Sequence, residues 1–304
     1  MNETNADALK EWQKRQESEA FAECLSRAEA GDINAIGKLF TCYNRGTGGA
    51  AHDVERADYW LSRWCDYHHE HAERGEAESM FLWGFLLRDG APRCGIPKDR
   101  ARSLVLVKQA AEAGYSLACE DYGRWLVHGA FGLEKDEAAG FAFLSRCGRL
   151  PECPNAKRDL ACCYHYGVGT AKDEDQAFLW YVAWIDEGDD WQDSDLLAVA
   201  GEYERRGDLA AALRWYEDAA DGAEPDPTAE KVIGMWLYCG KGTPRDLKRA
   251  KKLLAHAAGV GGDDDAAKLY YFILDEEKHG LCGRTPTCLP VDVPPLNYRW
   301  SPIE

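Results

Sequence analysis

The chain has 304 residues, of which 45% are apolar and 29% charged, as is usual for a soluble folded protein or a repeat array. Its net charge of −17 disfavours nucleic acid and anionic membrane as partners. We find no apolar h-region near the N-terminus and no run of about 18 apolar residues, so we expect neither a signal peptide nor a transmembrane helix. The sequence therefore predicts a cytoplasmic protein, in which most of the 12 cysteines are buried free thiols.

The predicted elements begin with an N-terminal capping helix within residues 1–30. Leu9, Trp12, Phe21 and Leu25 follow broadly helical spacing there.

Two linked patterns then recur six times within residues 31–262. In the first, an aspartate is followed by a small residue four positions later and by a large apolar residue seven positions later. The six sets are Asp53/Ala57/Trp60, Asp99/Ser103/Leu106, Asp136/Gly140/Phe143, Asp173/Ala177/Trp180, Asp208/Ala212/Trp215 and Asp246/Ala250/Leu253. Recurrence at this spacing indicates a repeat architecture.

The second pattern is a large-small pair upstream of each aspartate. The pairs are Ile36-Gly37, Trp83-Gly84, Tyr122-Gly123, Leu160-Ala161, Ala200-Gly201 and Ile233-Gly234. In five repeats a loop glycine follows six residues later, and in the first repeat it comes later, at Gly46. We therefore expect two helices per repeat, joined by a turn that a glycine opens and that an N-capping aspartate closes. The small residues allow the two helices to approach closely.

After the repeats, residues 263–280 carry helical apolar spacing and predict a C-terminal capping helix. Residues 281–304 contain five prolines and predict an extended tail. The tail either packs back on the helices or reaches a partner. Packing is favoured because Tyr298, Trp300 and three aliphatic side chains would otherwise face water.

Together the patterns read L-G-x-x-Y-x-x-G-x-G-x-x-x-D-x-x-x-A-x-x-W-Y, which resembles the Sel-1-like repeat, a relative of the tetratricopeptide repeat. The fourth repeat matches with Leu160, Tyr164, Gly167, Gly169, Asp173, Ala177, Trp180 and Tyr181. The resemblance implies an all-α protein, a right-handed α-solenoid of about six helix-turn-helix repeats with helical caps.

Two glycine-rich loops, Gly167–Lys172 and Gly240–Thr243, have some features of a phosphate-binding loop. Neither has the G-x-x-x-x-G-K-[ST] spacing between a strand and a helix, so we interpret both as helix-to-helix turns. No nucleotide or other cofactor is expected.

Cys65, His68, His69 and His71 form the densest group of metal-ligand residue types. On a helix some of them share a face, but a partly solvated helix face explains the group as well, and we predict no metal site.

No catalytic triad can be assembled from motif spacing. Some cysteine-rich members of the family are linked to β-lactam binding or hydrolysis, but the cysteines here follow no repeat register, so the chain is predicted not to be an enzyme.

Binding is the other use of such solenoids. By analogy with tetratricopeptide repeats, solvent positions of the first helices lie two residues before and two or five after the large residue of each pair. The predicted partner-binding residues on this concave face are Lys38, Phe81, Phe85, Arg88, Arg124, Arg158, His165, Arg205, Lys231, Met235 and Tyr238. Every repeat contributes a basic residue, which suits an acidic segment. Alternatively, an acidic exterior that includes Asp189, Asp190, Asp193, Asp195 and Asp263–Asp265 binds a basic partner.

The resemblance implies a solenoid whose function is to bind another protein. Family members of this kind act as bacterial immunity proteins that neutralise a cognate toxin or effector, or as cytosolic adaptors and regulators of signalling or secretion. The acidic composition favours an immunity protein, since many toxins are basic. A β-lactamase-like hydrolase is the weaker alternative.

Overall fold

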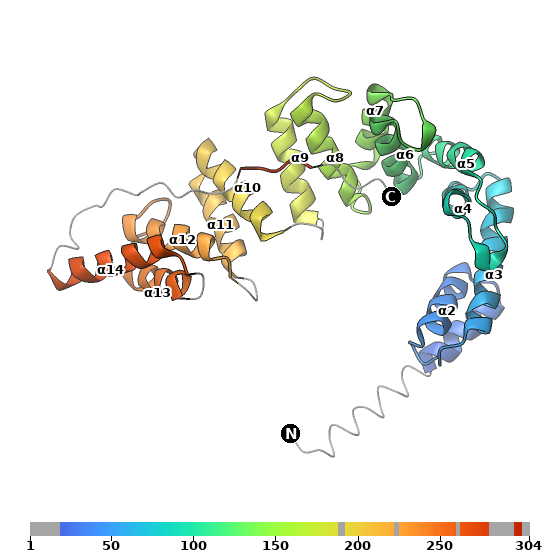
Figure 1. Cartoon of the computed structure of the whole chain (residues 1–304), viewed down its shortest axis with the longest axis horizontal. Coiled ribbons are helices and arrows are strands. Elements are labelled where there is room, and N and C mark those ends of the chain that lie inside the picture. Colours follow the sequence, from blue (N-terminus) through green and yellow to red (C-terminus); the bar gives the residue numbers. More distant parts are fainter. Residues whose placement is uncertain (1–18, 188–191, 222–224, 260–261, 280–294, 300–304) are drawn as a thin grey trace, which may run out of the picture. The chain divides into compact units, whose positions relative to one another are not determined.

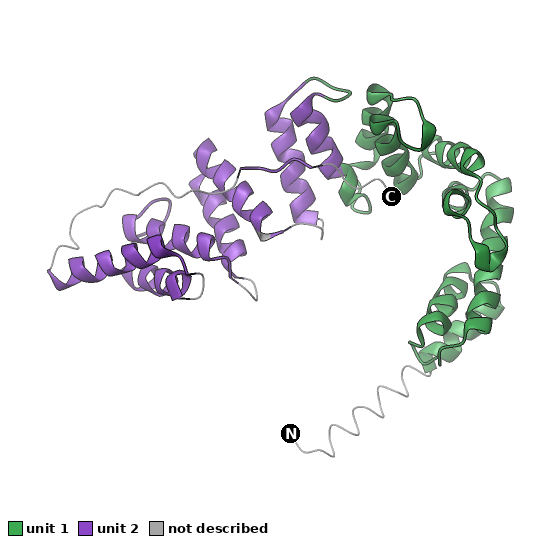
Figure 2. Ribbon diagram, viewed as in Figure 1, with its two compact units in different colours: residues 1–156, 168–171, 303–304 green, residues 157–167, 172–302 purple. Residues whose placement is uncertain are grey.

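The computed structural model describes residues 19–187, 192–221, 225–259, 262–279 and 295–299 (Figure 1). Within these residues the regular elements are all helices, apart from one isolated bridge between Ala91 and Ile96. None of the helices in this part of the chain is long and apolar enough to cross a membrane. The chain divides into two compact units: residues 1–156, 168–171 and 303–304 form unit 1, and residues 157–167 and 172–302 form unit 2 (Figure 2).

Unit 1 is a series of antiparallel helix pairs. Its helical residues 19–29 are followed by α2 (Ile33–Arg45), α3 (Val54–Glu73), α4 (Ala77–Asp89), α5 (Arg100–Glu112), α6 (Ser116–His128) and α7 (Glu137–Cys147), with short 3-10 turns η1 (Pro92–Cys94) and η2 (Ala130–Gly132). Helix α2 packs on α3, α4 on α5 and α6 on α7, and successive pairs are joined because α3 packs on α4 and α5 on α6.

Unit 2 continues the same arrangement. It contains most of α8 (Pro154–Tyr166), then α9 (Glu174–Glu187), α10 (Asp193–Arg206), α11 (Leu209–Ala220), α12 (Pro227–Cys239), α13 (Leu247–Gly259) and α14 (Asp264–Lys278). Its core is formed by aromatic and aliphatic side chains from every one of these helices. The stacking of helix pairs confirms the expected all-α solenoid.

The six repeat aspartates all cap the second helix of their pair. Each side chain accepts a hydrogen bond of 2.9 or 3.0 Å from a backbone N–H in the first helical turn: Asp53 from Arg56, Asp99 from Arg102, Asp136 from Ala139, Asp173 from Asp175 and Gln176, Asp208 from Ala211, and Asp246 from Arg249. Each aspartate N–H also donates to a carbonyl of the preceding helix, as Asp99 does to Leu87 at 2.7 Å. One residue therefore ends the turn and fixes the entry of the next helix, as the repeat spacing predicted.

The small residues lie where paired helices cross. A Cβ added to Gly84 on α4 would lie 2.9 Å from Val107 Cγ2 on α5. Gly123 on α6 and Gly140 on α7 face each other, and a Cβ on Gly140 would lie 2.7 Å from the Gly123 carbonyl oxygen. In the other four repeats an alanine occupies the second-helix position and is fully buried, as at Ala177 and Ala212. The helices approach closely because these side chains are small.

The two glycine-rich loops are turns between helices, as predicted. Gly240 ends α12 with a φ of +74° and donates to the Trp236 carbonyl, and Lys241 then forms an ion pair with Glu204 at 2.5 Å. In the other loop Lys172 pairs with Glu174 at 2.9 Å. Both lysines therefore neutralise neighbouring carboxylates.

The cysteines of the described residues are free thiols, and most of them are buried. Cys162 and Cys163 are fully buried in α8. Burial, with the Cys94 thiol beside it at 3.6 Å, raises the pKa of Cys65 to about 12. These thiols thus act as small apolar core residues. Cys282 and Cys288 lie outside the described residues.

The close approach predicts that Gly84→Leu destabilises the protein. The added side chain would overlap Val107 and the Ser103 carbonyl, and overpacking of this kind costs about 1–3 kcal/mol. Urea unfolding followed by circular dichroism measures the change. Gly259→Leu is the matched control, because no atom lies within 4 Å of a Cβ at that exposed helix end, and we expect a change within about 0.5 kcal/mol. If both variants have the same free energy of unfolding, Gly84 does not lie at the crossing of α4 and α5.

Thiol burial predicts an order of alkylation in the folded protein. At pH 8, iodoacetamide should label the half-buried Cys94 and Cys239 first among the ten cysteines of the described residues, whereas Cys162 and Cys163 should react only after denaturation. Their thiols are excluded from solvent, and burial raises the pKa of Cys162 further above its usual value. Mass spectrometry of timed samples identifies the labelled sites. Labelling of Cys162 at the rate of Cys239 would contradict the packing of α8.

Candidate functional site

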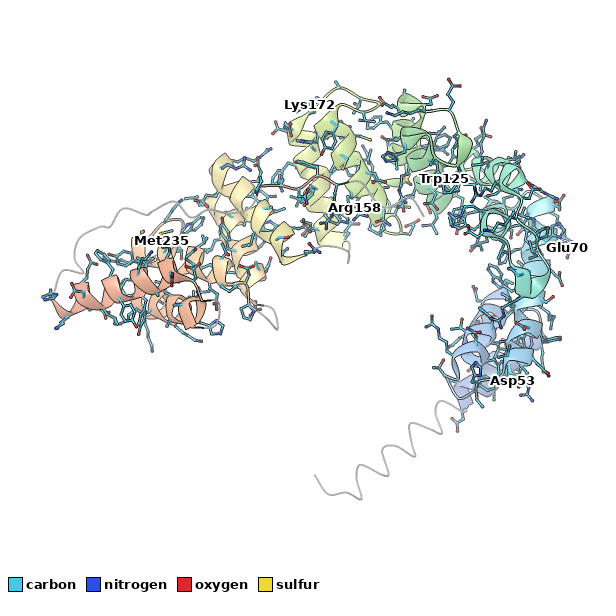
Figure 3. The ribbon with its side chains drawn as sticks, in the orientation of Figure 1. Asp53, Glu70, Trp125, Arg158, Lys172 and Met235 are labelled. Carbon is cyan, nitrogen blue, oxygen red and sulfur yellow. The ribbon has the colours of Figure 1, made fainter. Side chains whose placement is uncertain are left out.

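Five of the predicted partner-binding side chains are buried, so the expectation that they face solvent is wrong. Phe81, Arg124, Arg158, Met235 and Tyr238 are between 2% and 7% exposed. Figure 3 labels Arg158 and Met235 on their helices. Arg158 lies over the ring of Trp184, with its guanidinium carbon 5.1 Å from the ring centroid.

Most of these side chains are buried because the first helix that carries them packs against two other helices. Helix α4 packs on both α3 and α5, α6 on α5 and α7, and α12 on α11 and α13. Each of these three first helices thus contacts the second helix of its own pair and that of the preceding pair. Few solvent positions remain, and α12 is consequently buried at most positions from Ala229 to Tyr238.

Most of the predicted basic residues already have acidic neighbours. Arg88 pairs with Asp89 at 2.7 Å, Arg124 with Glu120 at 3.1 Å and Lys231 with Asp263 at 2.6 Å. Arg205 is exposed and pairs with Glu202. Lys38 is exposed on α2, and Phe85 is half-buried against the Arg88 guanidinium at 4.2 Å. These pairs leave little uncompensated positive charge for an acidic partner.

The group of Cys65, His68, His69 and His71 is divided among separate partners. Cys65 contacts Cys94, and His68 Nδ1 lies 3.0 Å from Ser79 Oγ. Burial, and to a smaller extent the charge of the nearby His71, lowers the pKa of His68 to about 4, so this imidazole is neutral. His69 stacks on Trp83 and His71 on Tyr67. The described residues contain no group of three or more ligand-type side chains that converge on one point.

The most distinctive surface lies on unit 2, where residues 295–299 cross helices α8, α9 and α10. We name these residues the tail segment, and Figure 1 shows it in red beside the three helices. Pro295 and Asn297 are exposed, whereas Leu296 and Tyr298 are half-buried and pack against the core of unit 2. This alternation is that of an extended chain. The packing of Tyr298 agrees with the prediction that the tail folds back; the other apolar side chains of that prediction lie outside the described residues.

The surface that holds the tail segment is formed by five side chains, which we name the tail slot: His165, Tyr166, Tyr181, Trp184 and Asp195. The first two lie on α8, the next two on α9 and the last on α10. Of these five, His165 was predicted as a concave-face binding residue and Asp195 as part of the alternative acidic exterior. Tyr181 belongs to the repeat motif, but the sequence gives no signal that its hydroxyl meets a distant segment.

Aromatic rings enclose Tyr298. Its ring stacks on His165, with centroids 4.2 Å apart and an interplanar angle of 17°, and meets the Tyr181 ring edge-on at 5.2 Å. His165 is fixed because its Nδ1 lies 2.9 Å from Glu174 Oε2, and a carboxylate can only accept, so the imidazole donates. The rings therefore form a preorganised site for a planar side chain.

Two tyrosine hydroxyls lie at the tail backbone. Tyr166 donates to the Tyr298 carbonyl at 3.1 Å, and the Tyr181 hydroxyl lies 3.5 Å from the Asn297 carbonyl. The Tyr166 hydrogen bond is made to a main-chain atom, so it would be available to any extended peptide, whereas the Tyr181 proton is donated to Asp195. Specificity must come from the pockets that take its side chains.

Asp195 provides a negatively charged contact for the next residue, Arg299. This carboxylate is 2% exposed, and it accepts from the Tyr181 hydroxyl at 2.7 Å and from the Gln192 N–H at 2.9 Å. Arg299 Nη2 lies 3.2 Å from Asp195 Oδ2, the oxygen that also accepts from Gln192, and the guanidinium carbon lies 5.8 Å from the Trp184 ring centroid. Burial and the hydrogen bond to Asp195 raise the pKa of Tyr181, so its hydroxyl stays protonated.

The acidic exterior predicted from the sequence is only partly exposed. Asp264 and Asp265 face solvent, whereas Asp263 caps α14 and Asp195 is buried. Asp189 and Asp190 lie outside the described residues. Asp195 therefore belongs to the tail slot and not to an outer acidic face.

Comparison with known proteins agrees with this architecture. The Sel1 repeat model matches residues 34–66, 77–115, 116–146, 154–189, 197–223 and 228–261. Sel1 repeats mediate protein–protein interactions, and their solenoid is typically an interaction scaffold.

A curated relative is the chitin synthase regulator SKT5 of Malassezia restricta, 28% identical over 140 residues. That match covers 45% of this chain and 9% of the relative, so the chain spans less than a tenth of its length.

Two solved structures share the fold. A protective antigen of uropathogenic Escherichia coli with an SLR fold is 22% identical, with a TM-score of 0.53 over 88% of this chain and 53% of the antigen. A Sel1 repeat protein from Oxalobacter formigenes is 20% identical, with a TM-score of 0.51 over 85% of this chain and all of that one. With six matched repeats and the observed helix pairs, the chain belongs to the Sel1 repeat family.

Proposed function

We propose that this chain binds a partner protein by holding an extended, positively charged segment of the partner on unit 2. The observation that carries the proposal is the tail segment itself. A stretch of polypeptide already lies across α8, α9 and α10, with both its backbone and its side chains contacted. A surface that binds one extended segment has the hydrogen-bond donors and pockets to bind another.

The charge distribution supports a basic partner over an acidic one. The chain has 53 acidic and 36 basic residues. Among the predicted basic residues, Arg88, Arg124 and Lys231 are compensated by neighbouring carboxylates. The excess acids would steer a basic segment toward the surface and raise its association rate at low ionic strength.

A toxin or effector that the chain neutralises is the specific partner we propose, because the acidic composition suits a basic toxin. A regulatory adaptor is the second candidate. It is favoured by the curated relative, which is a regulator of chitin synthase, although the match covers only 9% of that protein. Either role requires a stable complex and no turnover of a small substrate.

Affinity for the native partner tests the proposal. Partner proteins retained stoichiometrically by the tagged full chain are identified by mass spectrometry and then purified. In a Tyr298→Ala/Arg299→Ala background, where the chain's own segment no longer competes, His165→Ala combined with Tyr166→Ala should weaken binding at least tenfold, or about 1.4 kcal/mol, because a ring and a backbone hydrogen bond of the slot are lost. Raised salt should slow association.

Tyr271→Ala is the matched control, since this tyrosine is 67% exposed on α14 and away from the slot contacts. It should change affinity less than twofold. Lys38→Glu combined with Arg205→Glu tests the two exposed basic residues among the predicted concave-face residues. If this reversal abolishes binding while the slot variant binds normally, the partner is acidic and docks on the first helices, which contradicts the proposal.

A further inference from the structure

We propose that the tail slot recognises an aromatic residue followed directly by arginine, and that the chain's own Tyr298-Arg299 occupies the slot until a partner segment of the same chemistry displaces it. The inference rests on the proposed function for its partner, but the chemistry of the slot stands on contacts within unit 2 alone.

The first pocket selects an aromatic ring. His165 and Tyr181 present a face and an edge to Tyr298, at centroid distances of 4.2 and 5.2 Å. An aliphatic side chain would lose the stacking on His165, and a small residue would leave the two rings in water. The Tyr298 hydroxyl is not required by any contact made to the ring, so phenylalanine would also fit.

The second pocket selects a cation. Asp195 is buried, and among the described residues its ion-pair partner is Arg299. Its other contacts come from neutral donors, the Tyr181 hydroxyl and the Gln192 N–H. A buried carboxylate that loses its cation is destabilised, so an empty slot would favour another cation at this point. The Trp184 ring beside the guanidinium favours planar arginine.

Acidic groups also lie near Tyr298. Burial, and to a smaller extent the charges of Glu174 and Glu202, raises the pKa of Tyr298 above its usual value, while the charge of Arg206 acts in the opposite direction. An acidic residue in the place of Arg299 would lie beside the Asp195 carboxylate and would be repelled by it. A segment with the order aromatic–arginine fits, whereas aromatic–glutamate does not.

The backbone contacts fix the direction and register of the segment. Tyr166, which is 55% exposed, donates to the carbonyl of the aromatic residue itself, and Tyr181 lies beside the carbonyl that precedes it. The Tyr166 hydrogen bond requires no particular side chain and adds affinity to any segment whose ring and cation are correctly spaced. The single Tyr181 proton is donated to Asp195, so Tyr181 contributes its ring and not a second backbone hydrogen bond.

A peptide-binding experiment on the full chain tests the inference. The probe is a fluorescein-labelled peptide with the sequence of residues 294–300, PPLNYRW. It is titrated by fluorescence anisotropy into the wild-type chain and into a Tyr298→Ala/Arg299→Ala variant whose own segment lacks both side chains. The variant should bind the peptide at least tenfold more tightly than wild type, because its slot is vacated.

Substitutions in the peptide test the chemistry without altering the protein. Replacing the peptide's tyrosine with alanine, or its arginine with glutamate, should weaken binding to the vacated variant at least tenfold; phenylalanine in place of tyrosine should bind within about threefold. Adding Tyr166→Phe to the vacated variant should weaken binding severalfold, and adding Tyr271→Phe should not. Circular dichroism confirms that each variant is folded.

The inference is wrong if wild type and the vacated variant bind the peptide equally, or if the glutamate peptide binds as well as the arginine peptide. Light scattering gives a further test. If wild type is a dimer and the Tyr298→Ala/Arg299→Ala variant is a monomer, the tail occupies the slot of a second copy, and the inference is wrong. A different result would contradict the proposed function and leave the slot chemistry intact. If the peptide binds as expected but does not displace the native partner, the slot chemistry holds and the partner binds elsewhere.

Discussion

The close contact between the two helices of each repeat is the constraint on which the rest of the structure depends. Gly123 and Gly140 bring α6 and α7 so near that a Cβ on either would meet backbone atoms of the other helix. With the helices this close, the aspartate that opens the second helix reaches a carbonyl of the first, as Asp136 does to Leu126 at 2.9 Å. Turn, cap and crossing point are therefore set by a few positions, and buried aromatic residues such as Trp184 and Trp236 fill the remaining space.

This constraint explains why the repeat fold could be predicted from one sequence. The aspartates, loop glycines and small residues act through local geometry, so their spacing appears directly in the sequence. The six caps, the glycine turns and the helix pairs were all predicted from that spacing. The N-terminal segment is less informative, because only residues 19–29 of the predicted helix within 1–30 are described as helical.

The partner-binding residues were harder to predict because exposure depends on neighbours outside the repeat. Arg124 occupies a position that is open in an isolated helix pair, yet the surrounding helices bury it beside Glu120. The tail slot could not be predicted either. It joins Tyr181 and Asp195 to residues more than 100 positions away, and the Tyr181–Asp195 hydrogen bond itself follows no repeat spacing. The one sequence feature that pointed to a packed tail was the presence of Tyr298 in a proline-rich segment, where its ring would otherwise face water.

Occupation of a binding surface by the chain's own segment changes what a partner must supply. A covalently attached segment meets its site at an effective concentration on the order of millimolar, so a free peptide of equal intrinsic affinity would compete poorly. A partner that displaces Tyr298 and Arg299 must therefore bind more tightly than the motif alone allows, through contacts outside the slot. Exposed side chains of neighbouring helices, such as Leu179 on α9, are available for such contacts. An acidic protein with an occupied slot would in this way reject most basic peptides that it meets and retain a partner that also matches the surrounding helices.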